Sequence, residues 1–268
     1  MLAEADDGAW IRWEEEGTGE PLVLVMGLGG AGSAWSRLVP LLARDLRVIW
    51  LDNRGTGRSD RIGATGTRMG GLVADVVAVL DAAGIGAAHV MGTSLGGMVA
   101  QALALERPER VASLVLAATT PAGLAGGPPW PLLGAGALRP LLGPTRVAAV
   151  VQRALYAPQT ALLDVDADLA VAREEPTPTW TALTQLLVGA AHDARPRLEE
   201  LAGVPTTVVH GTADRIFATA RARELAEGIP GARLELVAGA GHVLATDAGE
   251  RVAAIVRAHV ARATAPGP

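Results

Sequence analysis

The residues best suited to chemistry surround Ser94, in the run Gly92-Thr93-Ser94-Leu95-Gly96. An apolar run, Ala87–Met91, precedes it, and small and aliphatic residues typical of a helix, Val99–Leu105, follow it. A serine on so sharp a strand-to-helix turn tolerates only small residues two positions away, and Gly92 and Gly96 meet that need. The chain has 33 glycines, so the pattern can arise by chance. With a strand before it and a helix after it, the pattern predicts a nucleophilic serine above a helix N-terminus.

A serine hydroxyl needs a general base, usually a histidine that a carboxylate orients. Of the five histidines, His242 lies in a Gly-Ala-Gly-His loop after the last predicted strand, and we expect it to be the base. His89 and His210 lie in predicted strands and favour buried structural roles, whereas His192 favours a capping or salt-linked role. His259 lies within the last predicted helix.

The carboxylate is expected in a loop after a strand. Asp214 ends the run His-Gly-Thr-Ala-Asp, so the chain order is Ser94, Asp214, His242. An aspartate that simply stabilises a turn would look the same there. Asp247 is nearer to His242 in sequence, but it precedes the last predicted helix, and an N-cap is the better interpretation.

Negative charge on a reacting oxygen needs N–H donors. The backbone N–H of Leu95, directly after the serine, is one candidate, and that of Leu28, in the loop Gly27-Leu28-Gly29-Gly30, is the other. The same glycines could merely turn the chain. A phosphate cradle is disfavoured because no Lys-Ser or Lys-Thr pair follows them.

Strands and helices alternate on both sides of an irregular helical segment, which predicts an α/β fold with a mostly parallel sheet flanked by helices and a helical cap insertion. The core is expected over 1–120 and 197–268, and the cap over 121–196. Predicted strands are Ala9–Glu15, Pro21–Met26, Arg47–Leu51, Ala87–Met91, Arg110–Ala117, Pro205–His210 and Ala232–Val237. Predicted helices are Ser33–Ala43, Thr67–Ala83, Val99–Leu105, Val147–Leu155, Leu162–Arg173, Trp180–Ala191, Ala218–Glu227 and Gly249–Ala263.

Composition narrows the function classes. The chain of 268 residues has a net charge of −5 with acids and bases interspersed, which disfavours nucleic-acid binding. No uninterrupted apolar run is long enough to span a membrane, and the acidic first residues do not resemble a signal peptide. Cysteine is absent, which excludes disulfides and thiolate chemistry. We expect a cytoplasmic protein that is a monomer or a homodimer.

Four segments, in this order, resemble the α/β-hydrolase fold superfamily: Met26–Gly30, Asp52–Asp60, Gly92–Met98, and His210–Asp214 followed by Gly239–His242. The resemblance spans Pro21 to His242, with the insertion where that family carries its cap. It implies Ser94 as nucleophile, Asp214 as acid and His242 as base, with Leu28 and Leu95 as oxyanion donors. Asp52 and Arg54 lie in a loop that is usually structural. Many members begin the oxyanion loop with His-Gly; here it is Met26-Gly27, a change that we expect to be tolerated.

This chemistry predicts cleavage of an ester of a hydrophobic small molecule through an acyl-enzyme, with no cofactor and no metal. Trp35, Trp130 and Trp180 are candidate pocket residues, and each could instead belong to a core. The same triad can serve a lactonase, a C–C-bond hydrolase, a perhydrolase, or a lyase or cyclase of natural-product biosynthesis. A small-molecule receptor is a further alternative, which turnover would exclude.

Overall fold

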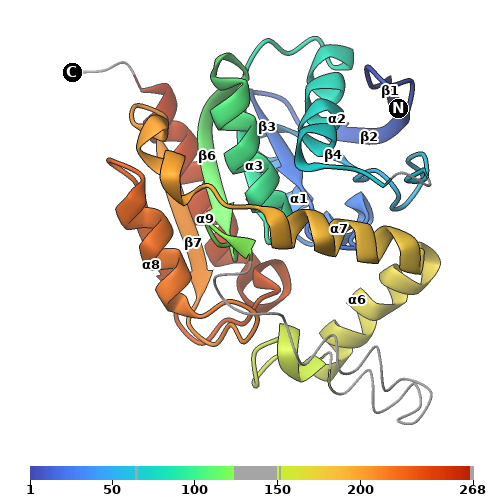
Figure 1. The fold of residues 1–268 in the computed structure, drawn as a ribbon. Helices are drawn as coiled ribbons and strands as arrows, with labels where there is room; N and C mark the ends of the chain where they lie inside the picture. Colours follow the sequence, from blue (N-terminus) through green and yellow to red (C-terminus); the bar gives the residue numbers. More distant parts are fainter. Residues whose placement is uncertain (64–65, 124–149, 151, 266–268) are drawn as a thin grey trace.

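The computed structural model describes residues 1–63, 66–123, 150 and 152–265, and these form one eight-stranded sheet with helices on both faces (Figure 1). The strand order is β1-β2-β4-β3-β5-β6-β7-β8. The bounds are β1 Leu2–Glu4, β2 Trp10–Glu16, β3 Glu20–Val25, β4 Leu46–Leu51, β5 Ala88–Thr93, β6 Val111–Ala117, β7 Thr206–Gly211 and β8 Arg233–Val237. β2 pairs antiparallel with β1 and β4, and the pairs from β4 to β8 are parallel.

The α-helices that flank the sheet are α1 Val39–Leu42, α2 Met69–Ala82, α3 Leu95–Glu106, α8 Thr219–Gly228 and α9 Leu244–Thr264. Side chains of α2, α3 and α8 pack in one buried cluster, and those of α1 and α9 pack in another. Successive strand residues point to opposite faces, so Val23 and Val25 join the first cluster while Leu22 and Leu24 join the second. Burial on both faces explains why the central strands are continuously aliphatic.

One predicted helix divides in two. The segment predicted as a helix over Ser33–Ala43 forms a 3-10 helix, η1, over Gly32–Trp35 and then the short α1. Pro40 lies in the first turn of α1, where its missing N–H breaks no helical hydrogen bond. The interruption before α1 leaves Trp35 and Leu38 fully buried against the sheet.

One extra helical turn precedes the last predicted helix. α9 begins at Leu244 and is interrupted at Ala248, whose φ of −155° and ψ of 38° are not helical, so the helix predicted from Gly249 is the part of α9 after this kink. Asp247 therefore lies inside the first turn, and its side chain is not an N-cap. It instead accepts hydrogen bonds from the N–H of Gly241 at 2.6 Å and of Ala157 at 2.9 Å, and from the Thr160 hydroxyl at 2.5 Å.

Between β6 and β7 in the sequence lie α6, Leu162–Glu174, and α7, Thr179–Ala191. Both lie at the edge where the parallel strands end (Figure 1). Their bounds match the predicted helices closely. Of the predicted helix Val147–Leu155, residues 147–149 and 151 lie outside the described residues, and residues 150 and 152–155 are helical as predicted. The 3-10 helix η4, Arg195–Leu201, returns the chain to the sheet.

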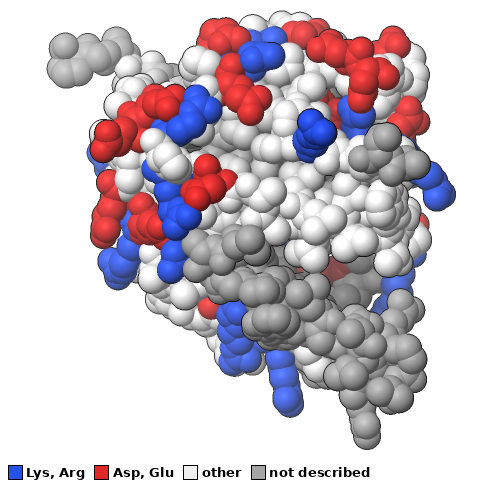
Figure 2. Space-filling view, viewed as in Figure 1, with Lys and Arg blue, Asp and Glu red and all other residues white. Residues whose placement is uncertain are grey.

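The described surface carries both charge signs. Acidic and basic side chains are interspersed on the face shown in Figure 2, and uncharged residues cover its centre. Among the described helices, none combines the length and the apolar character that crossing a membrane requires.

Candidate active site

Ser94 occupies the turn between β5 and α3 in a strained conformation. Its φ is +53° and its ψ is −119°, a combination that costs a non-glycine residue about 1–3 kcal/mol. Its N–H donates to the Ala117 carbonyl at 3.0 Å, which anchors the turn to the neighbouring strand. A Cβ at Gly92 would lie 2.1 Å from the Gly96 oxygen, and one at Gly96 would lie 2.0 Å from the Val25 oxygen. Backbone contact thus requires both glycines that the sequence pattern singled out.

His242 and Asp214, predicted as a pair, are in direct contact. Nδ1 of His242 lies 2.8 Å from Oδ2 of Asp214. The other carboxylate oxygen, Oδ1, accepts from the N–H groups of Ile216 at 2.7 Å and Phe217 at 3.0 Å. Because Nδ1 donates to the carboxylate, Nε2 is the ring nitrogen left to act as a base.

Electrostatics keep the Asp214 carboxylate ionised. Burial alone would raise the pKa of Asp214, but the hydrogen bond and charge of His242, together with the Phe217 N–H, hold that pKa below its ordinary value. The ring of Phe217 meets the His242 ring edge-on, with centroids 5.6 Å apart. The main-chain N–H of His242 donates to the Leu155 carbonyl at 2.7 Å, so the insertion also holds the histidine loop.

Ser94 and His242 line one cavity of about 530 Å³ beneath α6 and α7. No hydrogen bond joins them among the described residues, which is common before a substrate is bound. The structure thus brings the three predicted triad residues to one site, with the Asp214–His242 contact formed.

The two predicted oxyanion donors border the same cavity. In the described part of the chain, the N–H groups of Leu28 and Leu95 have no hydrogen-bond acceptor. Leu95 is the first residue of α3, where helical N–H groups lack intrahelical partners. A Cβ at Gly27 would lie only 3.1 Å from the Ser94 Cβ, so the loop approaches the serine closely. The two N–H groups can therefore serve an oxygen beside Ser94.

The three tryptophans predicted to line the pocket have different positions in the structure. Trp35 lines the cavity and is 2% exposed, so it is both pocket wall and core. Trp180 does not line the cavity: it is 47% exposed, and its Nε1 donates to the Gly63 carbonyl at 3.2 Å. Its position on the outer side of α7 corrects the prediction. Trp130 lies outside the described residues. The rest of the wall is largely apolar and includes Met91, Met98, Leu155, Leu186, Leu187, Val243 and Leu244.

Sequence reasoning missed a polar group in the cavity wall. Asp168 of α6 accepts from Arg37 Nε at 2.8 Å and from the Thr246 hydroxyl at 2.5 Å. Burial and the neighbouring Asp168 raise the pKa of Tyr156, which also lines the cavity. These residues come from distant parts of the chain, and no motif links them.

Of the four remaining histidines, His89, His210 and His259 are buried, and His192 is half-buried. His89 and His259 flank the Ser113 hydroxyl at 2.7 and 2.8 Å, and His210 lies with Nε2 3.6 Å from Asp214. His192 is the C-cap residue of α7 and makes no ion pair with any residue that the structure describes, contrary to the salt-linked alternative, and its ring lies 3.4 Å from Gln101. Burial lowers the pKa of His192 and of His259 to about 4.

The loop that follows β4 has the structural role expected of it. Asp52 accepts from the N–H groups of Gly32 at 2.6 Å and Arg58 at 2.9 Å. Arg54 pairs with the buried Asp75 at 2.5 Å and with Asp7. Neither Asp52 nor Arg54 lines the cavity of Ser94.

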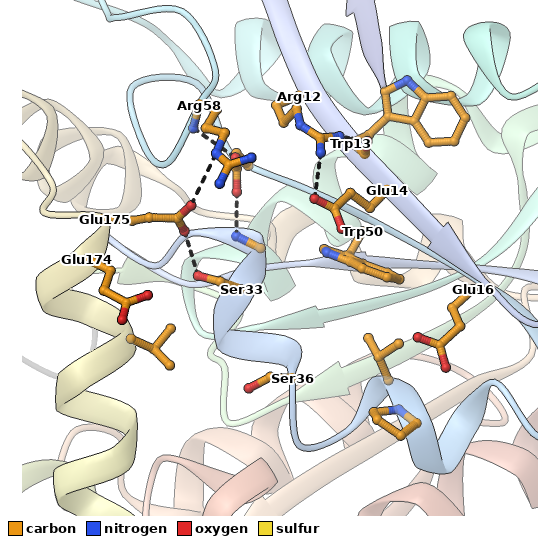
Figure 3. A pocket seen from close by; sticks show the side chains of 15 residues that line it. Arg12, Trp13, Glu14, Glu16, Ser33, Ser36, Trp50, Arg58, Glu174 and Glu175 are labelled. Atoms are coloured by element: carbon orange, nitrogen blue, oxygen red, sulfur yellow. Dashed lines mark hydrogen bonds and ion pairs between the residues drawn. The ribbon is translucent and has the colours of Figure 1, made fainter.

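A second cavity of about 490 Å³ lies between η1, the paired strands β2 and β4, and the C-terminal end of α6 (Figure 3). Its wall is charged, with Arg12, Glu14, Glu16, Arg58, Glu174 and Glu175 among the lining residues. None of the three predicted triad residues reaches it. The residues predicted to be catalytic therefore belong to the larger, apolar cavity and not to this charged one.

Comparison with known proteins agrees with this fold. A family model described as alpha/beta hydrolase fold matches residues 20–248. A putative carbamate hydrolase, RutD, of Azorhizobium caulinodans is 32% identical over 87% of this chain and 88% of its own length. The polyketide synthase ThaQ of Burkholderia thailandensis is 36% identical over 93% of this chain, which covers only 12% of that protein. The solved enol-lactonase of Burkholderia xenovorans aligns with a TM-score of 0.82 at 25% identity, over 97% of this chain and all of its own.

Proposed function

This chain belongs to the alpha/beta hydrolase fold family, and we propose that it is a cofactor-independent serine hydrolase that cleaves an ester of a hydrophobic small molecule. Hydrolytic function follows from the family and from the hydrolases among its relatives. The observation that supports the finer proposal best is the 2.8 Å contact of His242 with Asp214 at the cavity that Ser94 lines.

In the proposed reaction, Nε2 of His242 takes the proton of Ser94 as its oxygen attacks the ester carbonyl. The N–H groups of Leu28 and Leu95 donate hydrogen bonds to the carbonyl oxygen and so stabilise the negative charge that develops on it. His242 then passes its proton to the leaving alcohol, and an acyl group remains on Ser94. Water, deprotonated by the same histidine, attacks this acyl-enzyme and releases the acid. Asp214 stays ionised and stabilises the imidazolium in both halves.

The cavity wall supports a hydrophobic substrate. Trp35, Met91, Met98 and Leu186 give it an apolar surface, and burial of apolar ligand surface contributes about 25 cal/mol per Å². A volume of about 530 Å³ suits a small molecule rather than a polymer.

The proposed cap is the segment 121–196, and the proposed core is 1–120 with 197–268. Leu155, Leu186 and Leu187 line the cavity from the segment, which supports a role for it in substrate choice. The segment would therefore set which acyl or alcohol group fits over Ser94.

A lactone is the second candidate substrate. The enol-lactonase that aligns with nearly the whole chain favours it, and a lactone is a cyclic ester that the same acyl-enzyme chemistry opens. A lactone yields one hydroxy acid, whereas an open ester yields two products, so product analysis separates the two.

The test is turnover of p-nitrophenyl esters of increasing acyl length by wild type and by Ser94→Ala. Wild type should hydrolyse the esters, with a preferred length that reports the size of the cavity, and the variant should fall to background. Absence of turnover on every ester and lactone, or full activity of the variant, would overturn the proposal. A lyase or cyclase reaction of the same triad would then be tested next.

A further inference from the structure

Gly29 is held at both of its main-chain polar groups by side chains of the segment 121–196. Its N–H donates to Gln185 Oε1 at 2.8 Å, and its carbonyl accepts from the Thr177 hydroxyl at 2.5 Å. Gly29 has a φ of +71°, a conformation that few other residues adopt, and it directly follows Leu28. The peptide next to the proposed oxyanion donor is therefore fixed by the cap, across more than a hundred residues of sequence.

Gln185 is 0% exposed and uses both ends of its amide. Its Nε2 donates to the Arg54 carbonyl at 3.2 Å, so the side chain bridges the loop after β3 and the loop after β4. A buried amide without partners is costly, which favours one position of α7 relative to both loops. The position of α7 therefore restrains the position of the Gly29 backbone through Gln185.

A second contact reinforces the first. Glu175, at the end of α6, accepts from the Ser33 hydroxyl at 2.6 Å and lies 3.7 Å from Arg58 (Figure 3). Ser33 follows the same loop at the start of η1. Side chains at 175, 177 and 185 thus contact the loop at two points, one beside the proposed donor and one beyond it.

We propose that Gln185 and Thr177 are positioning residues that set the oxyanion hole, so that Leu28 has its reactive geometry only while the cap is docked on the loop. This inference rests on the proposed function. Neither residue needs to touch the reacting atoms, because each acts through Gly29. Displacement of a donor by about 1 Å can slow a reaction about a hundredfold, so loss of either hydrogen bond to Gly29 can lower the reaction rate strongly. The oxyanion hole then takes its reactive geometry at the same moment as the cap docks on the loop.

The experiment measures how fast an alkyl fluorophosphonate phosphonylates Ser94 in the full chain. Its phosphoryl oxygen gains negative charge during attack and needs the oxyanion hole, whatever the natural acyl group. Gln185→Leu removes both hydrogen bonds at similar size, and Thr177→Val removes one at nearly constant shape. Thr184→Val is the matched control, since Thr184 is buried on the same helix as Gln185 and its hydroxyl has no hydrogen-bond partner within the described part of the chain.

We expect Gln185→Leu and Thr177→Val to lower the maximal labelling rate at least about tenfold with little change in the probe concentration for half-maximal rate. Thr184→Val should label like wild type. Gln185→Glu, whose carboxylate still accepts from Gly29, should label faster than Gln185→Leu. Amide hydrogen exchange over residues 27–31 should accelerate in the two slow variants, a readout that needs no reaction.

Two failures are distinguishable. If wild type labels at Ser94 and a folded Gln185→Leu or Thr177→Val labels equally fast, the positioning role is wrong and the proposed function stands. If wild type itself is not labelled at Ser94, the proposed function fails, and this inference fails with it. Should Gln185→Leu not fold, Thr177→Val decides.

Discussion

His242 donates from Nδ1 to Oδ2 of Asp214 at 2.8 Å, although 28 residues separate them in sequence. The other oxygen of the carboxylate is held by the N–H groups of Ile216 and Phe217. Both oxygens are thus occupied, which fixes the carboxylate plane and with it the orientation of the imidazole. This arrangement determines that Nε2 is the nitrogen available to the cavity.

Replacement of Asp214 by asparagine should disable the base with little effect on folding. The Ile216 and Phe217 N–H groups retain the amide oxygen, so the amide nitrogen faces His242 and favours the wrong tautomer. We expect kcat for ester hydrolysis to fall about 10³- to 10⁴-fold with a small change in KM. Asp193→Asn, at a carboxylate paired with Arg195 on the surface, is the control. A variant within about tenfold of wild type would show that Asp214 does not orient the base.

The turn around Ser94 should tolerate no side chain at Gly96. Gly96→Ala would place a Cβ 2.0 Å from the Val25 oxygen, and both backbones must shift. We expect the free energy of unfolding in urea to fall by about 2 kcal/mol or more, with loss of esterase activity. Gly86→Ala is the matched control, because a Cβ there meets nothing within 4 Å. Equal stability of the two variants would contradict this packing.

Stability should decline as pH falls from about 6.5 to 4. Burial lowers the pKa of His192 and His259 to about 4, so both stay neutral in the native state. Over this interval the unfolded chain binds protons that the native chain does not, which lowers the free energy of unfolding by up to about 3 kcal/mol per histidine. The contribution is fully present above pH 6.5.

Urea titrations at several pH values check this dependence, with His192→Gln to isolate one residue. The variant should lose less stability than wild type between pH 7 and pH 4.5, because one proton-binding difference has been removed. Equal losses in the two proteins would mean that His192 does not contribute.

Substrate length should depend on the inner face of α7. Leu186→Trp fills part of the cavity, and we expect the preferred p-nitrophenyl ester to become shorter, with kcat/KM for the longest wild-type substrate lowered about tenfold or more. Leu183→Trp on the same helix is the control, since Leu183 is 46% exposed and does not line the cavity. If both variants keep the wild-type preference, the cavity is not the acyl site.

Much of the fold and the triad geometry could be predicted because local signals were strong. The run around Ser94 combines a steric need for glycine with strand and helix patterns, and the strand-ending positions of Asp214 and His242 follow from parallel topology. The division of the helix after β3 was missed because the apolar spacing continues across Pro40. Proline lacks a backbone N–H and is favoured in the first turn of a helix, so α1 begins there as a separate helix.

The cavity wall was harder to predict because it depends on packing between distant segments. The sequence around Trp35 and around Trp180 suggests the same role for both, yet Trp35 is buried in the cavity wall and Trp180 packs outside α7 against Gly63. Gln185 gave no signal either, since a single glutamine in an apolar helix is ordinarily a surface residue. Its role becomes visible only once α7 lies against Gly29.

The most direct measurement is peptide mass spectrometry of wild type quenched in acid during the first turnover of p-nitrophenyl butyrate. We predict a butyryl group on the peptide that contains Ser94, formed as fast as the first p-nitrophenol is released. Ser94→Ala should show neither adduct nor turnover above background. Turnover with the acyl group on another residue, or undiminished turnover by Ser94→Ala, would contradict an acyl-enzyme at Ser94.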